Sequence, residues 1–313
     1  MVKNSRWCGR ILKALLFTVI LAGCSRATSV VIEKRKVFTF PDEIVGTRFI
    51  GKIKARYYFY SPELLKVYVL DSTGRVEATI SFPSGNAPEE IKPRFNYMNL
   101  TKDLFIIASQ FQKKVVLYSH MGEFLSFIPT KGMPLIPGII NGNIYCIERS
   151  GNQYFLRAYH DGEMVKEKKI EFYLPDKGYE GGVMLLSLYL TSDGIYIPES
   201  FILGVKFYDV KRNEITELFK KKGYMKKPEV QVQGNAKSII HLSAVTGIVA
   251  FNDYIMMVLE GSKQGNLLLL FDRHGNKLYE QYCQDKHFQI GVEINGDKVY
   301  GVCDNTVYRF FIK

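Results

Sequence analysis

The segment "VLDSTGRVEATISF", residues 69–82, places Asp71 beside two hydroxyl side chains and a glycine. A calcium loop would need several oxygen ligands at close spacing, whereas this segment offers one acid and a distant Glu77. Aspartic-protease chemistry needs paired aspartates, and an inserted residue breaks that motif here. We therefore interpret Asp71 as a turn residue whose carboxylate accepts hydrogen bonds from nearby backbone N–H groups.

A better candidate for a site is a set of acids that follow short apolar runs at equivalent points of the chain. They occur in "CIERSGN", "IPESFILG", "VLEGSKQG" and "VCDN", and His241, His287 and Arg48 begin neighbouring segments. Carboxylates and imidazoles brought to one face of the protein would bind a cation, an amine or a sugar. The sequence leaves open the alternative that the acids are solvated loop residues. These acids are Glu148, Glu199, Glu260 and Asp304.

The remaining histidines, His120, His160 and His274, lie in turns that resemble the turn of Asp71. We expect them to be exposed turn residues without a catalytic role. The spacing of cysteines and histidines matches no zinc site, and the sequence predicts no other metal site and no cofactor.

Three cysteines follow residue 24, namely Cys146, Cys283 and Cys303. Because their number is odd, at least one of them lies outside any disulfide within the chain. The pair Cys283–Cys303 is the one worth testing. The alternative is that all three are small buried residues in strands.

One strong run of basic residues, "KKKGYMKKP", spans residues 220–228. It is either a solvated loop or a contact for an anionic partner or for lipid headgroups. Tyr179 and Phe201, together with the tyrosine of this run, are the loop aromatics that could stack on a sugar. The candidate partner-contact residues are Lys220, Lys221, Lys222, Tyr224, Lys226 and Lys227.

The elements that position these residues come from a repeat. The segment "KVYVLDSTGRVEATISF" aligns with "KVVLYSHMGEFLSFIP", "FLRAYHDGEMVKEKKIEF", "VKFYDVKRNEITELF" and "LLLLFDRHGNKLYEQY". Each copy reads as a strand, a tight turn and a second, more polar strand. The copies lie about 40–63 residues apart, a spacing typical of propeller blades.

Two more strands precede the later hairpins, for example "LFIIAS" after "NYMNLT", and a strand in "YIMMVLE" after "IIHLSAV". Four antiparallel strands per unit predict an all-β, six-bladed β-propeller. The chain after residue 287 supplies only three strands. We expect the N-terminal strand, residues 30–40, to pair with residues 306–312 and so complete the last blade without an open edge.

The N-terminus combines four basic residues with the apolar run "ALLFTVILAG". That run is too short to span a bilayer and fits the core of a secretory signal peptide. It ends in "LAGC", which resembles the lipobox of bacterial lipoproteins, in which the chain is cut before a cysteine that then carries lipid. The alternative is an ordinary signal peptide. The expected organisation is a signal peptide over 1–23 with lipobox Leu21, Ala22 and Gly23, a tether over 24–29 that begins with lipidated Cys24, and a propeller over 30–313.

With its lipobox and six units, the chain resembles the six-bladed β-propeller lipoproteins of Bacteroides-type bacteria, which are related to NHL and TolB-type propellers. This resemblance implies a lipid-anchored protein of the cell envelope. Surface lipoproteins of that lineage often carry acids just after the lipid cysteine, and "CSRATS" has none. By that analogy the protein faces the periplasm from the outer membrane.

Composition and motifs narrow the function further. The net charge of +11 falls to +7 without the four basic residues of the signal peptide, 38 basic against 31 acidic residues. No nucleic-acid motif appears, and we expect no nucleic-acid partner. The sequence also shows no nucleophile–base pair and no phosphate loop. We therefore expect a binding or scaffolding module for a partner protein, a peptide or a glycan. Two alternatives stay open: a glycan or peptide lyase or hydrolase with His241 or His287 as base, and a purely structural envelope protein.

Overall fold

The computed structural model describes residues 30–44, 46–94, 96–176, 179, 183–233, 236–263, 265–283, 288–294 and 298–313. The expected signal peptide, the tether with Cys24 and its lipobox, and His287 lie outside these residues.

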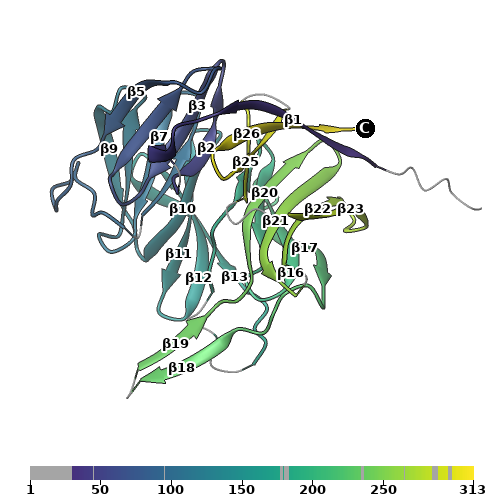
Figure 1. Ribbon diagram of the computed structural model, residues 1–313. Coiled ribbons are helices and arrows are strands. Elements are labelled where there is room, and N and C mark those ends of the chain that lie inside the picture. Colours follow the sequence, from purple (N-terminus) through teal and green to yellow (C-terminus); the bar gives the residue numbers. More distant parts are fainter. Residues whose placement is uncertain are drawn as a thin grey trace, which may run out of the picture.

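Six four-stranded antiparallel sheets surround a central axis, as the repeat predicts (Figure 1). Blade 1 consists of β2 (Arg48–Ile53), β3 (Arg56–Ser61), β4 (Lys66–Leu70) and β5 (Val76–Ser81). Blade 2 consists of β6 (Asn96–Leu100), β7 (Leu104–Ser109), β8 (Lys114–Ser119) and β9 (Phe124–Pro129). Blade 3 consists of β10 (Met133–Ile140), β11 (Asn143–Ser150), β12 (Gln153–His160) and β13 (Glu163–Ile170).

The second half of the chain forms the other three blades. Blade 4 consists of β14 (Tyr189–Leu190), β15 (Gly194–Pro198), β16 (Leu203–Asp209) and β17 (Glu214–Lys221). Blade 5 consists of β20 (Ala244–Phe251), β21 (Tyr254–Ser262), β22 (Gly265–Asp272) and β23 (Lys277–Cys283). Blade 6 consists of β24 (Phe288–Val292), β25 (Val299–Cys303), β26 (Thr306–Ile312) and, from the other end of the chain, β1 (Ile32–Thr39).

The ring is closed by the pairing of β1 with β26, which confirms the expected closure. Ile32 lies opposite Ile312 and Thr39 opposite Thr306. Beyond the strand ends, the N–H of Val31 donates to the carbonyl of Lys313 at 3.0 Å, and the reverse bond measures 2.9 Å. The short helix η1 (Asp42–Ile44) then leads the chain into blade 1.

The hydrophobic core lies between the blades, in six clusters that each join two neighbouring blades. Alternation of side chains along a strand produces this arrangement. In β3, Tyr57 and Phe59 pack toward blade 6, whereas Tyr58 and Tyr60 pack toward blade 2. Because the middle strands are buried on both faces, they read as continuous apolar runs such as "LLLLF" in β22.

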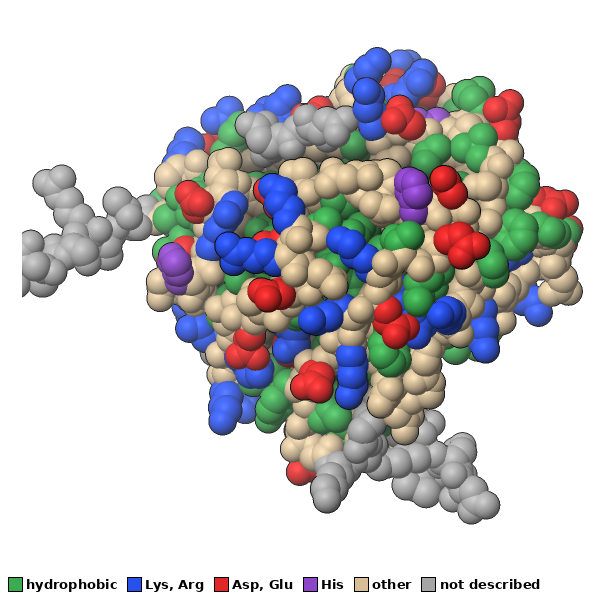
Figure 2. Space-filling model, turned by 180° about the vertical axis from the view of Figure 1, so that it is seen from behind, with side chains coloured by type: hydrophobic (Ala, Val, Ile, Leu, Met, Phe, Trp, Pro, Cys, Tyr) green, Lys and Arg blue, Asp and Glu red, His purple; other side chains and the backbone are tan. Residues whose placement is uncertain are grey.

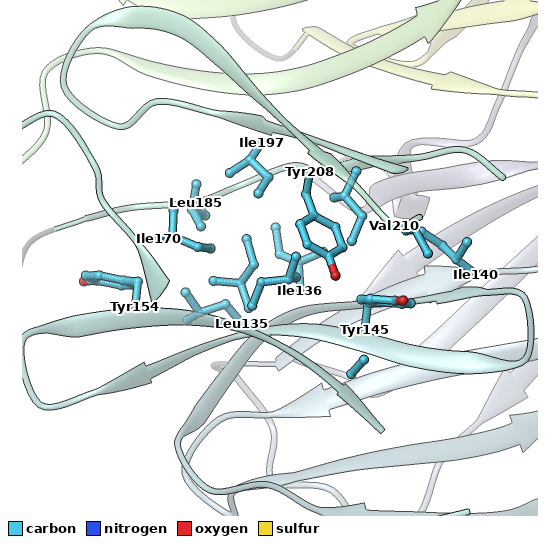
Figure 3. Packing of buried hydrophobic residues seen from close by; sticks show 14 residues of the cluster. Leu135, Ile136, Ile140, Tyr145, Tyr154, Ile170, Leu185, Ile197, Tyr208 and Val210 are labelled. Carbon is cyan, nitrogen blue, oxygen red and sulfur yellow. The ribbon is translucent and has the colours of Figure 1, made fainter. Parts of the chain in front are cut away.

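The cluster between blades 3 and 4 shows this packing in detail (Figure 3). Leu135, Ile136 and Tyr145 come from blade 3 and face Ile197 and Tyr208 of blade 4. The rings of Tyr145 and Tyr208 lie 5.9 Å apart between centroids. Each such interface fixes the tilt of one blade against the next and thereby the shape of the central opening.

The outer hairpins are held by the turn chemistry predicted for Asp71. Its Oδ1 accepts hydrogen bonds from the N–H of Thr73 at 2.8 Å and of Arg75 at 3.1 Å. Gly74 follows with a φ of 87°, a conformation that glycine adopts without strain. Asp272 repeats the bond pattern with the N–H groups of residues 274 and 276, so the carboxylates in these turns are structural.

One element departs from the expected propeller. The connection from blade 4 to blade 5 contains a two-stranded hairpin, β18 (Glu229–Gln233) and β19 (Ala236–Ile240), which projects away from the ring (Figure 1). The segment "IIHLSAV" was expected to be an innermost strand, but that strand, β20, begins only at Ala244. The reason is that the alternating "EVQVQGNAKSII" pattern, with Gly-Asn at its centre, is itself a hairpin signal.

None of the helices in the described part of the chain has the length and apolar character needed to cross a membrane.

Candidate functional site

The strongest candidate site is a cavity of about 890 Å³ on the propeller axis. Its wall is formed mainly by the innermost strands, by the turns that follow them and by the segment that precedes β14. It extends from the turns at Thr101 and Asn141 toward the opposite face, where Arg48 and Glu260 lie. Much of the wall is aliphatic, with side chains that include Ile50, Ile136, Ile139, Leu186, Leu188 and Ile248.

A few polar groups interrupt this apolar wall. The guanidinium of Arg48 lies over the ring of Tyr97, 4.7 Å from its centroid, and this cation–π contact orients the charge. The hydroxyl oxygens of Ser187 and Thr246 are buried, and within the described residues neither has a hydrogen-bond partner. Their oxygens have almost no accessible surface, so a bound molecule would reach them only after the side chains rotate toward the cavity.

Gln289 also lines the cavity, but its side chain holds the closure of the ring. Its Oε1 accepts a hydrogen bond from the N–H of Phe49 at 2.6 Å, and its Nε2 donates to the carbonyl of Thr47 at 2.8 Å. Both partners belong to the start of blade 1. The amide thus ties blade 6 to blade 1 at the cavity wall.

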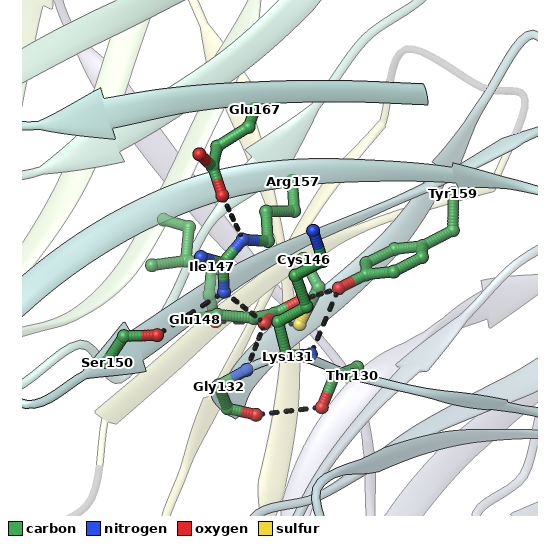
Figure 4. A network of polar contacts seen from close by, with 10 residues as sticks. All are labelled: Thr130, Lys131, Gly132, Cys146, Ile147, Glu148, Ser150, Arg157, Tyr159 and Glu167. Atoms are coloured by element: carbon green, nitrogen blue, oxygen red, sulfur yellow. Dashed lines mark hydrogen bonds and ion pairs between the residues drawn. The ribbon is translucent and has the colours of Figure 1, made fainter. Parts of the chain in front are cut away.

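The sequence predicted that four acids, two histidines and Arg48 share one face. Among those that the structure describes, only Glu260 and Arg48 line the cavity. Glu148 is fully buried inside blade 3 (Figure 4). Its carboxylate accepts hydrogen bonds from Nη1 of Arg157 at 2.7 Å, from the N–H of Gly132 at 2.6 Å and from the hydroxyl of Tyr159. Burial of these charges is compensated by the ion pair, as it must be in a protein interior.

Arg157 joins Glu148 to a second acid. Its Nε lies 2.7 Å from the carboxylate of Glu167 on β13, a residue whose side chain is 40% exposed. Burial lowers the pKa of Arg157, but the bonds to the two glutamates outweigh it and the pKa is raised. Arg157 is therefore charged, and the three side chains form an acid–base–acid triad across β11, β12 and β13.

Blade 4 repeats this triad at the same register. The carboxylate of Glu199 lies 2.5 Å from Nζ of Lys206, which is also 3.8 Å from Glu217. In blade 3 the cation Arg157 lies opposite Cys146 in the ladder, and the acid Glu148 follows two residues later. In blade 4 Lys206 lies opposite Ile197, and Glu199 again follows two residues later. The acids also hold the chain that enters the blade, since Glu199 accepts a bond from the N–H of Tyr173 at 2.9 Å.

These triads explain why Glu148 and Glu199 do not project into the cavity. Each acid lies on the strand face that packs against the preceding blade, together with Cys146 and Ile197 respectively. A signal for them was present in the sequence, since "FLRAYH" and "GVKFYD" each carry one cation inside an apolar strand. Such a cation requires a buried acid nearby.

The other expected site residues lie apart from one another. Asp304 is exposed in the turn between β25 and β26, with a φ of 51°. His241 stacks on Phe201, with 4.8 Å between ring centroids, and does not belong to the cavity wall. Phe201 and Tyr179 are only 8% and 6% exposed, because each packs on its neighbours, so neither offers an open ring for a sugar.

The other described histidines and cysteines lie outside the cavity, and each is exposed or packs against neighbouring side chains. His160 and His274 are exposed, as expected, whereas His120 is half-buried and packs 5.2 Å from the ring of Phe105. Burial raises the pKa of the Cys146 thiol. No disulfide joins the described cysteines, and no cluster of three metal-ligating side chains occurs in the part of the chain that the structure describes.

The basic run is spread over the end of β17 and the loop that follows. Lys220 pairs with Glu217 at 2.5 Å, and Lys227 pairs with Asp176 at 2.9 Å. Tyr224 is half-buried and its hydroxyl lies 3.4 Å from the carboxylate of Glu280. The structure shows no ion pair of the other lysines with a described residue; these are Lys221, Lys222 and Lys226.

No protein-family model matches the chain, and no curated protein matches it by sequence. Solved structures do resemble it. A member of the DUF4221 family from Bacteroides vulgatus superposes with a TM-score of 0.62 at 10% identity, covering 92% of this chain and 99% of that one. A putative exported protein from Bacteroides fragilis gives 0.58 at 12% identity, with coverage of 93% and 97%.

An enzyme appears among the similar structures as well. Virginiamycin B lyase from Staphylococcus aureus superposes with a TM-score of 0.50 at 13% identity, covering 90% of this chain and 99% of that one. Identities this low show the fold alone. The chain is thus a six-bladed propeller whose structural neighbours include propeller proteins of Bacteroides.

Proposed function

We propose that this protein is a binding module of the cell envelope that holds an extended peptide segment in its central cavity. The observation that carries the proposal is the axial cavity of about 890 Å³, with an aliphatic wall and with Arg48 and Glu260 toward one face. Cavities of this size that combine apolar walls with a few placed polar groups are typical of ligand sites.

A binding role is favoured over catalysis by the chemistry of the cavity wall. The described lining residues include neither a histidine nor a cysteine. Among the acids of the wall, Glu293 is engaged by Lys52 and by Lys298, and these contacts outweigh burial and lower its pKa. A general acid–base residue needs a pKa near the working pH, whereas the lowered pKa keeps Glu293 ionised.

A peptide fits the wall better than a glycan. Sugar sites commonly offer an open aromatic face, but each aromatic side chain of this wall packs against a neighbour. The guanidinium of Arg48 lies over Tyr97, Phe49 packs on Phe59, and Tyr189 packs on Tyr196. Aliphatic side chains instead match the apolar side chains of a peptide, and the hydroxyls of Ser187 and Thr246 could bond to its backbone if their side chains rotate toward the cavity. Arg48 in blade 1 and Glu260 in blade 5 lie on either side of blade 6. Arg48 would therefore contact an acidic group of the peptide and Glu260 a separate basic group.

The test is binding of a panel of short peptides that differ in apolar content and in charge, measured by calorimetry with the full chain. Glu260→Gln and Arg48→Gln should each weaken binding by about tenfold or more, as expected for a lost charge-assisted hydrogen bond. Asp304→Asn is the matched control, because Asp304 is exposed and lies outside the cavity wall. Equal binding by Glu260→Gln and the unsubstituted chain, or no binding of any peptide, would contradict the proposal.

Envelope location and lipid anchoring form part of the same proposal. They are supported by the N-terminal signal with its lipobox and by the likeness to a putative exported protein. We propose that Cys24 carries the lipid and that the propeller faces the periplasm from the outer membrane. Metabolic labelling with an alkyne-tagged fatty acid should label the chain, and Cys24→Ala should abolish the label. Labelling that survives this substitution would rule out anchoring at Cys24.

A second candidate function is contact with an anionic partner through the basic run. It rests on Lys221, Lys222 and Lys226, which have no ion pair with a described residue. A pull-down from the native envelope should lose partners when these lysines are replaced by glutamine. Replacement of Lys168 and Lys169 on β13 by glutamine is the control. An unchanged set of partners would exclude this contact.

A further inference from the structure

The outer edge of blade 2 is unusually apolar. Eleven large hydrophobic side chains are exposed in the described part of the chain, and five of them fall within residues 111–127. In β9 the exposed fractions are 42% for Phe124, 49% for Leu125 and 40% for Phe127. Two further exposed side chains, Phe111 and Met121, lie in the turns at the two ends of this blade. Hydrophobic side chains are visible at the right-hand edge of Figure 2, the side on which blades 1 and 2 lie.

The other outer strands are protected against pairing, and β9 is not. An outer strand is the edge of its sheet, and proteins usually place charges there to prevent association. The sequences of β1 (IEKRKVFT), β5 (VEATIS), β13 (EMVKEKKI), β17 (EITELFKK) and β23 (KLYEQYC) each contain at least one charged residue. The sequence of β9, FLSFIP, contains none. This exception indicates that the edge of blade 2 is a surface for association.

The backbone of β9 fixes which residue is free to pair. The N–H of Thr130 donates to the carbonyl of Lys113 at 2.8 Å, and residues 126–129 pair with β8 without a register shift. Because antiparallel ladders alternate between bonded and non-bonded pairs, Ile128 is bonded to β8 whereas the N–H and C=O of Phe127 point outward. Pro129 also faces outward and has no N–H to leave unpaired.

We infer that β9 pairs in antiparallel fashion with β9 of a second copy of this chain, about a two-fold axis at Phe127. The two Phe127 residues then exchange their outward N–H and C=O groups, and their rings form a cross-strand aromatic pair. Blade 2 of each copy thereby joins into one eight-stranded sheet.

A second copy is the occupant that these observations select. Pairing of β9 with itself is isologous, closes at a dimer and brings no charges together. Pairing with any other outer strand of this chain would bury at least one charged residue beside the apolar edge, and would create a heterologous contact that does not close on itself. This inference is independent of the central cavity.

The test uses cysteine cross-linking of the full chain in its native envelope. A residue on a two-fold axis lies opposite the same residue of the second copy. Phe127→Cys should therefore form a disulfide-linked dimer on mild oxidation. Val165→Cys, on the charged outer strand of blade 3 and 51% exposed, is the matched control and should not. Cross-linking of Phe127→Cys no greater than that of Val165→Cys, or a product with a different protein, would overturn the inference.

Sedimentation of the full chain in detergent provides the second measurement. The unsubstituted protein should sediment as a dimer, and Phe127→Lys or Leu125→Lys should convert it to a monomer, while Val165→Lys leaves the dimer intact. Circular dichroism checks that each variant is folded, and two variants are used so that one misfolded protein does not decide the result. A monomeric unsubstituted chain, or a dimer that both lysine variants retain, would refute self-association through β9.

Discussion

The buried triads allow the structural role of Glu148 to be tested against a ligand-binding role. Arg157→Met removes the cation that faces Glu148 and leaves a carboxylate with no exposed surface in the core of blade 3. Breaking a buried ion pair by removing one partner costs about 3–5 kcal/mol. The bonds from Gly132 and Tyr159 remain, so we expect a loss at the lower end of this range, about 3 kcal/mol.

The complementary single substitution should cost less. In Glu148→Gln the guanidinium of Arg157 keeps its bond to Glu167, whose side chain is partly in solvent. The double variant Glu148→Leu/Arg157→Leu removes both charges and should be less destabilised than Arg157→Met, because apolar replacement of a buried pair is often neutral. The N–H of Gly132 would then lack its acceptor, which costs about 1–3 kcal/mol.

Guanidinium-induced unfolding, followed by circular dichroism, measures these differences. Lys169→Met is the control, because Lys169 and Glu171 form an exposed pair at 3.7 Å, which should contribute less than about 1 kcal/mol. If Arg157→Met also cost less than about 1 kcal/mol, the ion pair would not be the buried element that the structure shows. A loss of peptide binding without a loss of stability would instead assign Glu148 to a site.

Three further predictions address the turns and the closure of the ring. Gly74→Ala should destabilise the protein by more than Gly162→Ala. Both glycines have a positive φ, but a Cβ at residue 74 would lie 2.6 Å from the ring of Phe38, whereas residue 162 has open space. In thermal unfolding, Gly162→Ala should lower the free energy of unfolding by about 1–2 kcal/mol, and Gly74→Ala should lower it further. The hydrogen bonds from Thr73, the largest cause, hold the pKa of Asp71 well below its ordinary value of 3.8, so its contribution to stability is present above that value and is lost as the pH falls. The difference in unfolding temperature between the unsubstituted chain and Asp71→Asn should therefore shrink below about pH 4, and a difference that is constant with pH would contradict this. Deletion of residues 30–40 should leave β26 as an open edge and abolish cooperative unfolding, and a deleted chain that still unfolds cooperatively would show that closure by β1 is dispensable.

The fold was predictable because the outer hairpins of blades 1, 2, 4 and 5 repeat the same local chemistry. In each, the side chain of Asp71, Ser119, Asp209 or Asp272 accepts backbone bonds in the turn, and a glycine or asparagine follows. An apolar strand before the turn and a more polar strand after it mark the outer half of a blade. That pattern sets the number of blades and leaves three strands at the C-terminus that require a fourth. The insertion β18–β19 was not predicted because the apolar residues of "IIHLSAV" match the pattern of an innermost strand, although β19 ends at Ile240 and β20 begins at Ala244.

The cavity was harder to predict because it depends on which face of a strand a residue occupies. Glu260 and Glu148 both occur near the end of a second strand, yet a shift of one residue moves a side chain to the opposite face of a sheet. In blade 5 a bulge between Leu259 and Ser262 separates Glu260 from the regular ladder.

The register shows which residues truly correspond. Met257 lies opposite Leu269 in blade 5 as Cys146 lies opposite Arg157 in blade 3, so Leu259 and Leu269 take the places of Glu148 and Arg157. The outer acid is retained, since Leu269 faces Glu280 as Arg157 faces Glu167. One position in the repeat therefore holds a buried ion pair in blades 3 and 4 and two leucines in blade 5. This substitution within a single chain follows the rule that a buried charge needs its partner, because the acid and the cation are replaced together.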